Sequence, residues 1–250
     1  MGSNSGQTET VKATETAFTL LEGLAEVGGA ARVVDLATHH SMPKSTVYKH
    51  LATLRSLGYV QQRDGRYVLG TGLADLGEHA RARDDLYPIV KSHVDRLAET
   101  TGESAGFTVE RDGAVLDLYC TGDGPDALAH SNSRYPHCSA PGKAILSRLP
   151  SDRIEAIIDE HGLPERTDAT ITDRDRFTTE LDRTRERGIA FERAEQYQDV
   201  RSVAVPIIDD DAVVGAIYAA GPTERLSSKR FEESIPGIIL STVDTLQDEL

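Results

Sequence analysis

The sequence contains little cysteine: Cys120 and Cys138 are the only two among 250 residues. Two cysteines exclude the disulfide framework of a small secreted protein, and the absence of any CxxC pair or His/Cys array leaves no zinc module to predict. Long apolar runs are also missing, since no stretch approaches the ~18 residues that a membrane-spanning helix needs. The first ten residues are polar and lack the apolar core of a signal peptide. We therefore expect a cytoplasmic protein with no membrane partner.

Lysine is scarce as well, with six residues against 21 arginines. The 41 acidic residues outnumber the 27 lysines and arginines, which gives a net charge of −14. Carboxylate-rich surfaces stay hydrated and soluble in concentrated salt. The composition therefore favours a salt-adapted cytoplasm, as in a halophilic archaeon. An ordinary acidic protein from a GC-rich genome is the alternative.

The negative charge is unevenly distributed along the chain. Residues 1–85 hold nine Lys and Arg against ten Asp and Glu, whereas residues 86–250 hold 18 against 31. A uniformly acidic protein would repel the phosphates of nucleic acid. Within residues 39–67, however, Asp64 is the only acidic residue. It is outnumbered by five basic residues: Lys44, Lys49, Arg55, Arg63 and Arg66.

The N-terminal third predicts three helices followed by a hairpin. Apolar residues at helical spacing predict a first helix over residues 9–27, ended by Gly28-Gly29, and a short second helix. After a turn at residues 39–42, Pro43 begins a third helix that extends to Leu57, because proline is tolerated in a first helical turn. The expected inward residues are Ala17, Phe18, Leu21, Leu24, Ala25, Val33, Leu36, Ala37, Val47, Leu51, Leu54 and Leu57.

The opposite face of the third helix is small, polar and basic, with almost no carboxylate. Small residues permit close approach to a major groove, while hydroxyls and lysines reach phosphates and base edges. Two strands, residues 59–62 and 66–69, follow around an Asp-Gly hairpin signal, and this wing has an arginine on each side of its tip. The predicted DNA-binding residues are Lys44, Ser45, Thr46, Tyr48, Lys49, Thr53, Arg55, Arg63 and Arg66. A helical subdomain with a merely solvated basic face is the alternative, but it explains neither the spacing nor the hairpin.

The C-terminal two thirds predict an α+β domain. A linker helix over residues 71–85 leads into an amphipathic helix from Leu86. The expected strands are 104–110, 114–120, 189–192, 202–208 and 213–220. A loop that leads into a helix is expected over 137–146, and further helices are expected from 172 to Gly188 and from about Ser227, the last with a kink at Pro236. Hairpin-connected strands with interleaved helices favour an antiparallel sheet packed with helices.

Several motifs in this chain resemble those of IclR-family transcriptional regulators. In the N-terminal third the matching residues are Val33–Ala37, Met42–Leu51, Leu54, Gly58–Val60 and Tyr67–Gly70. Downstream they are Cys138–Ala144, Gly188–Ala190, Glu192, Val203–Pro206, Val214–Ala216, Gly221-Pro222 and Arg225. The resemblance covers the chain from about Thr14 to its end. It implies a winged helix-turn-helix over 9–70, a linker helix over 71–85 and a GAF/PAS-like effector-binding domain over 86–250.

A loop of small residues ahead of a helix, Ser139–Gly142, is the candidate pocket. The unpaired N–H groups of a helix N-terminus suit a carboxylate. We expect the long side chain of Lys143 to be solvated. The resemblance implies that the effector-binding residues are Cys138, Ser139, Ala140, Pro141, Gly142, Glu192, Ser202, Tyr218 and Ala220. Family members often have small residues at positions 141, 218 and 220, so a small 2-oxo acid is not assumed; an organic acid, sugar-derived or aromatic, is expected.

Catalysis and metal binding are the weaker interpretations of this region. Cys138 beside His137 is compatible with an activated thiolate, but no third orienting group follows from the spacing, and a buried inert thiol is favoured. Together with Cys120 these two residues are only a weak metal signal. We therefore predict no cofactor, no metal and no enzymatic activity.

The predicted function is ligand-controlled regulation of transcription. The resemblance implies sequence-specific binding to double-stranded DNA, effector control through the linker helix and a catabolic operon as the target. One winged unit reads few base pairs, so a homodimer or tetramer on a palindromic operator is expected. Two alternatives stay open: a redox sensor that uses Cys120 and Cys138, and an acyl-transfer enzyme that uses Cys138.

Overall fold

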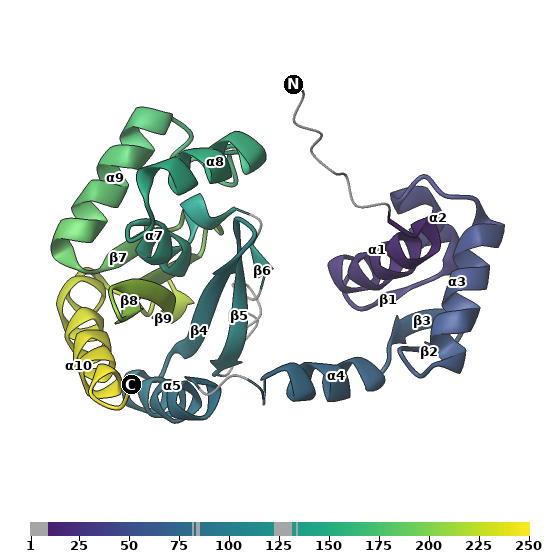
Figure 1. Cartoon of the computed structure of the whole chain (residues 1–250), viewed down its shortest axis with the longest axis horizontal. Helices are drawn as coiled ribbons and strands as arrows, with labels where there is room; N and C mark the ends of the chain where they lie inside the picture. Colours follow the sequence, from purple (N-terminus) through teal and green to yellow (C-terminus); the bar gives the residue numbers. More distant parts are fainter. Residues whose placement is uncertain (1–9, 82, 84–85, 123–131, 134) are drawn as a thin grey trace, which may run out of the picture. The chain divides into compact units, whose positions relative to one another are not determined.

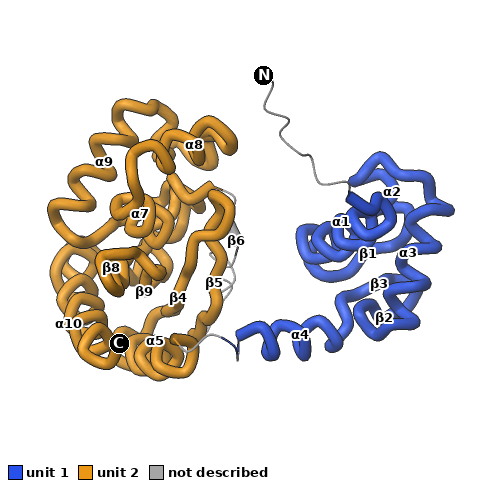
Figure 2. Tube along the Cα trace, viewed as in Figure 1, with its two compact units in different colours: residues 1–83 blue, residues 84–250 orange. Residues whose placement is uncertain are grey.

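The computed structural model describes residues 10–81, 83, 86–122, 132–133 and 135–250. The chain divides into two compact units, residues 1–83 and 84–250, each with its own hydrophobic core (Figure 2). The predicted domain bounds 9–70, 71–85 and 86–250 depend partly on residues 9, 82, 84 and 85, which lie outside the described residues.

Unit 1 is a bundle of helices with a small sheet (Figure 1). Its elements are α1 (Lys12–Glu26), β1 (Ala30–Ala31), α2 (Val33–His39), α3 (Lys44–Ser56), β2 (Val60–Arg63), β3 (Arg66–Leu69) and α4 (Gly72–Arg81). The predicted hairpin is confirmed, because Arg63 pairs with Arg66 across a two-residue turn. Asp64 and Gly65 have φ values of 50° and 76°, as a type I′ turn requires. The two-residue strand β1, which sequence patterning missed, completes a sheet of order β1-β3-β2.

The core of unit 1 corrects three predicted inward residues, of which Ala25 on α1 is exposed. Phe18 is 59% exposed and Leu57 is 61% exposed, whereas Leu20, which was not predicted, is fully buried. The apolar stripe of α1 is centred on Leu20, Leu21 and Leu24, which turns Phe18 to the outer side. Leu57 follows the last residue of α3, so the helical phase of the inward stripe does not extend to it.

Unit 2 is built on a six-stranded antiparallel sheet of order β6-β5-β4-β9-β8-β7 (Figure 1). The strands are β4 (Ser104–Arg111), β5 (Ala114–Thr121), β6 (Asn132–Ser133), β7 (Ala190–Arg193), β8 (Val200–Asp209) and β9 (Ala212–Pro222). The helices are α5 (Leu86–Thr101), a 3-10 turn (Pro136–Cys138), α7 (Ala140–Leu146), α8 (Ser151–His161), α9 (Arg174–Arg187) and α10 (Ile235–Gln247). Helix α8 was missed, although its buried residues Ile154, Ile157 and Ile158 have helical spacing.

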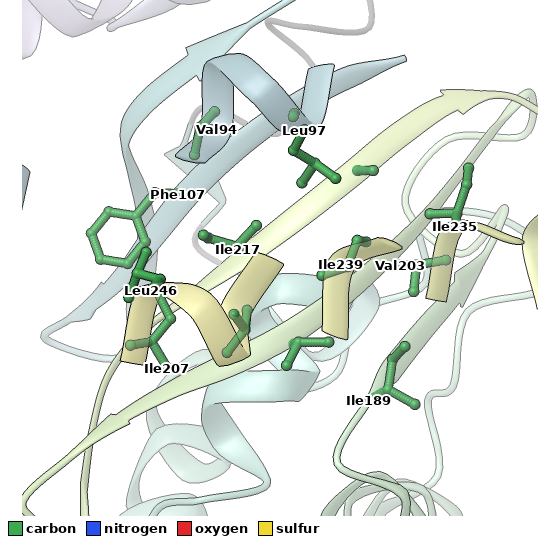
Figure 3. Packing of buried hydrophobic residues seen from close by; sticks show 14 of the residues in the cluster. Val94, Leu97, Phe107, Ile189, Val203, Ile207, Ile217, Ile235, Ile239 and Leu246 are labelled. Atoms are coloured by element: carbon green, nitrogen blue, oxygen red, sulfur yellow. The ribbon is translucent and has the colours of Figure 1, made fainter. Parts of the chain in front are cut away.

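Helices cover both faces of this sheet. One face carries large side chains such as Val203, Ile207 and Ile217, which pack with α5 and α10 (Figure 3). Side chains alternate along a strand, so Ala204, Ala216 and the other neighbours of these residues point to the opposite face, where α7 lies. The face that packs on α5 and α10 is the main core, and the α7 face is lined by small and polar residues.

The C-terminal helix also differs from its prediction. A π-helical turn, Arg230–Ser234, precedes α10, and Pro236 lies in the first turn of α10. Proline has no N–H to donate to the preceding turn, which favours a wider turn at this point over a simple kink. Together the two units confirm the predicted α+β class with two domains. No described helix is both long and apolar enough to span a membrane.

Candidate DNA-binding surface and candidate effector site

Helix α3 presents the predicted polar face to solvent. Buried Val47, Leu51 and Leu54 hold the helix against the core of unit 1. On the outer side Thr46 is half-buried, and the side chains of Lys44, Ser45, Tyr48, Lys49, Thr53 and Arg55 are exposed. The sequence of α3, KSTVYKHLATLRS, has no Asp or Glu, so no carboxylate of this helix repels a phosphate.

The wing continues this basic surface. Arg63 and Arg66 are exposed on either side of the hairpin tip. Arg55 on α3 donates to Oε1 of Gln62 on β2 at 2.5 Å, which joins the helix to the wing. Arg63 donates to Oε1 of Gln61 at 3.1 Å. These hydrogen bonds orient two guanidinium groups on the surface that α3 shares with the wing.

An apolar groove of about 530 Å³ borders the same helix, and Lys49 and Thr53 of the predicted DNA-binding set are among its lining residues. It runs between α1, the C-terminal end of α3 and α4, and Phe18, Leu57 and Leu76 on its walls are more than half exposed. Among its described residues, α4 has no buried side chain at all, although Leu73 and Leu76 share one side of the helix. Unit 1 therefore exposes an apolar surface that its own fold does not cover.

In unit 2 the polar candidates meet on the α7 face of the sheet. Strand register places them in three cross-strand rows, since directly paired residues share a face. The first row is Glu192, Ser202, Ala220 and Ser104. The second is Ala190, Ala204, Tyr218, Gly106 and Cys120, and the third is Pro206, Ala216, Thr108 and Asp117. The predicted residues Glu192, Ser202, Tyr218 and Ala220 are all fully buried here.

The first row contains a buried carboxyl. Glu192 Oε1 accepts from the backbone N–H of Glu195 at 2.6 Å, and its Oε2 accepts from Ser202 Oγ at 3.1 Å. Burial and the negative charge of Glu195 raise the pKa of Glu192 to about 7. Glu192 is fully buried and is therefore not a surface carboxylate at the end of its strand.

Lys143 corrects a sequence-based expectation. Its side chain is fully buried instead of solvated, and Nζ donates to both carboxylate oxygens of Glu195 at 2.6 and 2.8 Å. Lys143 is in the last turn of the seven-residue helix α7, whose whole length is buried. The Lys143 cation can be buried because the Glu195 carboxylate, which comes from a loop distant in sequence, neutralises its charge.

The N–H groups of Gly142 and Lys143 in the first turn of α7 already have hydrogen-bond acceptors within the protein. Ser139 Oγ accepts from the N–H of Gly142 at 3.2 Å, Ser139 O accepts from Lys143 N, and Pro141 has no N–H. A Cβ on Gly142 would lie 2.2 Å from Pro136 O, so only glycine fits. Cys138, Ser139, Ala140, Pro141 and Gly142 are all buried around this turn. They shape the wall of the α7 face.

A catalytic role for Cys138 has no support in this environment. Cys138 Sγ donates to Tyr135 O, and burial raises the pKa of its thiol to about 12. Burial also lowers the pKa of His137 to about 4, and Nε2 of its ring lies 3.1 Å from Pro164 O. A neutral thiol beside a neutral imidazole is not an activated nucleophile. Among the described residues, no three His, Cys, Asp or Glu side chains are grouped so as to hold a metal.

Comparison with known proteins matches both units. The model "Bacterial transcriptional regulator IclR C-terminal" matches residues 79–247, and "IclR helix-turn-helix domain" matches residues 13–64. The probable HTH-type transcriptional regulator ArcR of Halobacterium salinarum is 28% identical over 99% of this chain and 97% of its own length. The HTH-type transcriptional repressor AllR of Escherichia coli K12 is 29% identical over 90% and 88%.

Solved structures show the same fold. An IclR homologue from Microbacterium hydrocarbonoxydans, solved in complex with 4-hydroxybenzoate, superposes with a TM-score of 0.78. The alignment covers 96% of this chain and 99% of that one at 19% identity.

Proposed function

This chain belongs to the IclR family of transcriptional regulators, and from that premise we propose how its two units carry out regulation. It is a DNA-binding regulator with a C-terminal ligand-binding domain, and its relatives are regulators without enzymatic activity. In our proposal α3 and the wing bind a specific operator, and a small organic acid on the α7 face controls that binding.

The observation that carries the DNA-binding proposal is the acid-free face of α3 beside the arginine wing. In a chain of net charge −14, this surface gathers Lys44, Lys49, Arg55, Arg63 and Arg66. The exposed hydroxyls of Ser45 and Tyr48 and the half-buried Thr46 reach base edges or phosphates, and the exposed Thr53 adds a further acceptor. The basic side chains hold the phosphate backbone.

The test is binding to DNA from the chain's own promoter, measured by a mobility-shift assay in high potassium chloride. Lys49→Glu should abolish binding, because it places a carboxylate against the groove. Lys229→Glu makes the same charge change on the exposed surface of the other unit and should leave the affinity within about twofold. Equal affinities for wild type and Lys49→Glu would contradict the groove assignment.

The effector proposal rests on the chemistry of the first row. A Glu192 carboxyl with a pKa near 7 can carry a proton to donate, and buried Ser202, whose hydroxyl donates to Glu192, offers its oxygen as an acceptor. The Lys143 cation lies in the same cluster. In this proposal Cys138–Gly142 wall the site, and Ala220, which pairs with Ser202, is its small neighbour on β9. A thermal-shift screen of organic acids identifies a ligand by the rise in Tm, since a compound that binds only the folded state stabilises it. The same compound must then alter operator affinity.

We further propose that two copies associate through the apolar groove on unit 1. The groove presents protruding side chains, Phe18 and Leu76, next to a hollow, so the same patch can serve both partners of a two-fold pair. A homodimer would read two half-sites of a palindromic operator, and a tetramer would add a second pair. The target in this proposal is a catabolic operon in a salt-adapted cytoplasm, to which the acidic composition and the Halobacterium relative both point.

A further inference from the structure

Tyr218 occupies a compartment on the α7 face whose other buried residues are mostly alanine. Its side chain is fully buried between the sheet and α7. The buried residues of the same cluster are Ala140, Ala144, Ala190, Ala204, Ala216 and Ala220, with Val115 and Ile145. The opposite face of the sheet carries larger side chains, among them Val, Ile and Phe (Figure 3).

One glycine makes room for the aromatic ring. Gly106 on β4 is paired directly with Tyr218 on β9. A Cβ at position 106 would lie 2.5 Å from Cε1 and 2.6 Å from both Cζ and the phenol oxygen of Tyr218. The backbone of β4 is therefore the floor of the compartment, and the ring lies against it.

The hydroxyl at the polar end of the ring is held by a hydrogen bond to a buried carboxyl. The Tyr218 hydroxyl donates to Asp117 Oδ2 at 2.7 Å, and Thr108 Oγ1 donates to Asp117 Oδ1 at 2.5 Å. Packing alone would not need these groups, because a phenylalanine beside an apolar residue fills the same volume without a buried carboxyl. Apolar walls with one oriented polar group are the composition of a small-molecule site.

The compartment adjoins the proposed effector site. Tyr218 pairs with Ala204, and the next row on the same face pairs Ser202 with Ala220 and with Glu192. We propose that the phenol of Tyr218 acts as a built-in ligand that fills the aromatic half of the effector site. This chain then excludes aromatic effectors, and it takes a small aliphatic acid at the Glu192–Ser202 end. That the ring of Tyr218 fills a compartment able to hold a free phenol does not depend on the proposed function. The exclusion of aromatic effectors and the preference for an aliphatic acid rest on it.

The test removes the Tyr218 side chain by substitution and asks whether a free phenol binds in its place. The full-length Tyr218→Ala variant should melt about 10 °C below wild type. The probe is p-cresol, which is the tyrosine side chain as a separate compound. At about ten times its Kd, p-cresol should raise the Tm of Tyr218→Ala by about 3–5 °C. Wild type and Tyr218→Phe, whose compartments are filled, should not respond.

Toluene is the matched control, because it has the shape of p-cresol without the hydroxyl that Asp117 accepts. A smaller rise with toluene supports recognition of the phenol. An equal rise with toluene, no rise with p-cresol, or an equal rise in wild type would each overturn the inference. If Tyr218→Ala does not fold, Tyr218→Val keeps a strand-forming residue and is tested in the same way.

A second arm separates this inference from the proposed function. The acids that raise the Tm of wild type should be aliphatic, and benzoate should bind only Tyr218→Ala. Binding of benzoate to wild type would overturn the exclusion of aromatic effectors. p-Cresol could raise the Tm of Tyr218→Ala while no acid alters operator affinity. That result would support the compartment filled by Tyr218 and reject the proposed effector control.

Discussion

Lys143 and Glu195 form a buried ion pair between α7 and the loop after β7, with Nζ 2.6 and 2.8 Å from the two carboxylate oxygens. Thr167 and Thr170 donate to the backbone carbonyl of Glu195, so a further loop is tied to the pair. The pair thus joins three segments that are far apart in sequence and encloses the Glu192 end of the α7 face.

Breaking this pair should be strongly destabilising. Lys143→Met leaves the Glu195 carboxylate buried without a cation, and we expect a loss of about 3–5 kcal/mol in the free energy of unfolding. Adding Glu195→Gln should restore part of that loss, because the uncompensated charge is removed. Arg153→Ala breaks the half-exposed pair with Glu110 and should cost under about 1 kcal/mol. Urea denaturation of the four proteins checks the order.

The stability of unit 2 should fall as pH rises from about 4.5 to 7. Burial raises the pKa of both Glu192 and Asp117 to about 7, so the folded state holds protons that the unfolded state has released. Above pH 7 both states are ionised and the decline should level off. Glu192→Gln should reduce the decline by up to about 3 kcal/mol. Denaturation curves between pH 4.5 and 8 that are unchanged in Glu192→Gln would contradict this assignment.

Gly106 and Tyr218 should be energetically coupled. Gly106→Ala alone places a Cβ into the ring of Tyr218 and should destabilise by about 1–3 kcal/mol. In a Tyr218→Ala background the same change fills part of a cavity and should be neutral or stabilising. A double-mutant cycle by chemical denaturation measures the coupling, and simple additivity would show that the two residues do not contact.

The wing arginines should contribute to DNA affinity through phosphates. Arg63→Ala and Arg66→Ala should each weaken operator and unrelated DNA alike, and each should reduce the slope of log affinity against log salt by about one. Fluorescence anisotropy over a range of potassium chloride concentrations provides both numbers. A loss confined to the operator would instead assign the arginine to base recognition.

The apolar groove should determine the oligomeric state. Phe18→Glu with Leu76→Glu places two charges on the groove and should yield a monomer with weakened operator binding. Val34→Glu is the matched control, since Val34 is 41% exposed on α2 and does not line the groove. Sedimentation velocity distinguishes the species. A dimer that survives the double change would place the interface elsewhere.

Much of the fold was predictable because its signals are local. The stripe of Val47, Leu51 and Leu54 predicts α3, and Asp64-Gly65 predicts the hairpin, from residues at most a few positions apart. The prediction that Leu57 is buried was wrong because α3 ends at Ser56, and helical spacing does not apply beyond its end. The prediction that Lys143 is solvated was wrong for a different reason, because its partner Glu195 is 52 residues away and no local pattern points to it.

The sequence by itself indicated two units and a basic, acid-free helix in an acidic chain, because periodicity, turn residues and charge distribution are properties of short segments. Its motifs also carried the resemblance to the IclR family. Only the tertiary structure decided which side chains meet on the α7 face. Tyr218 and Asp117 are 101 residues apart, and strand pairing brings both beside Gly106 and Thr108. The order of strands in a sheet depends on pairings between distant segments, so no local pattern reveals that one phenol fills the space between them.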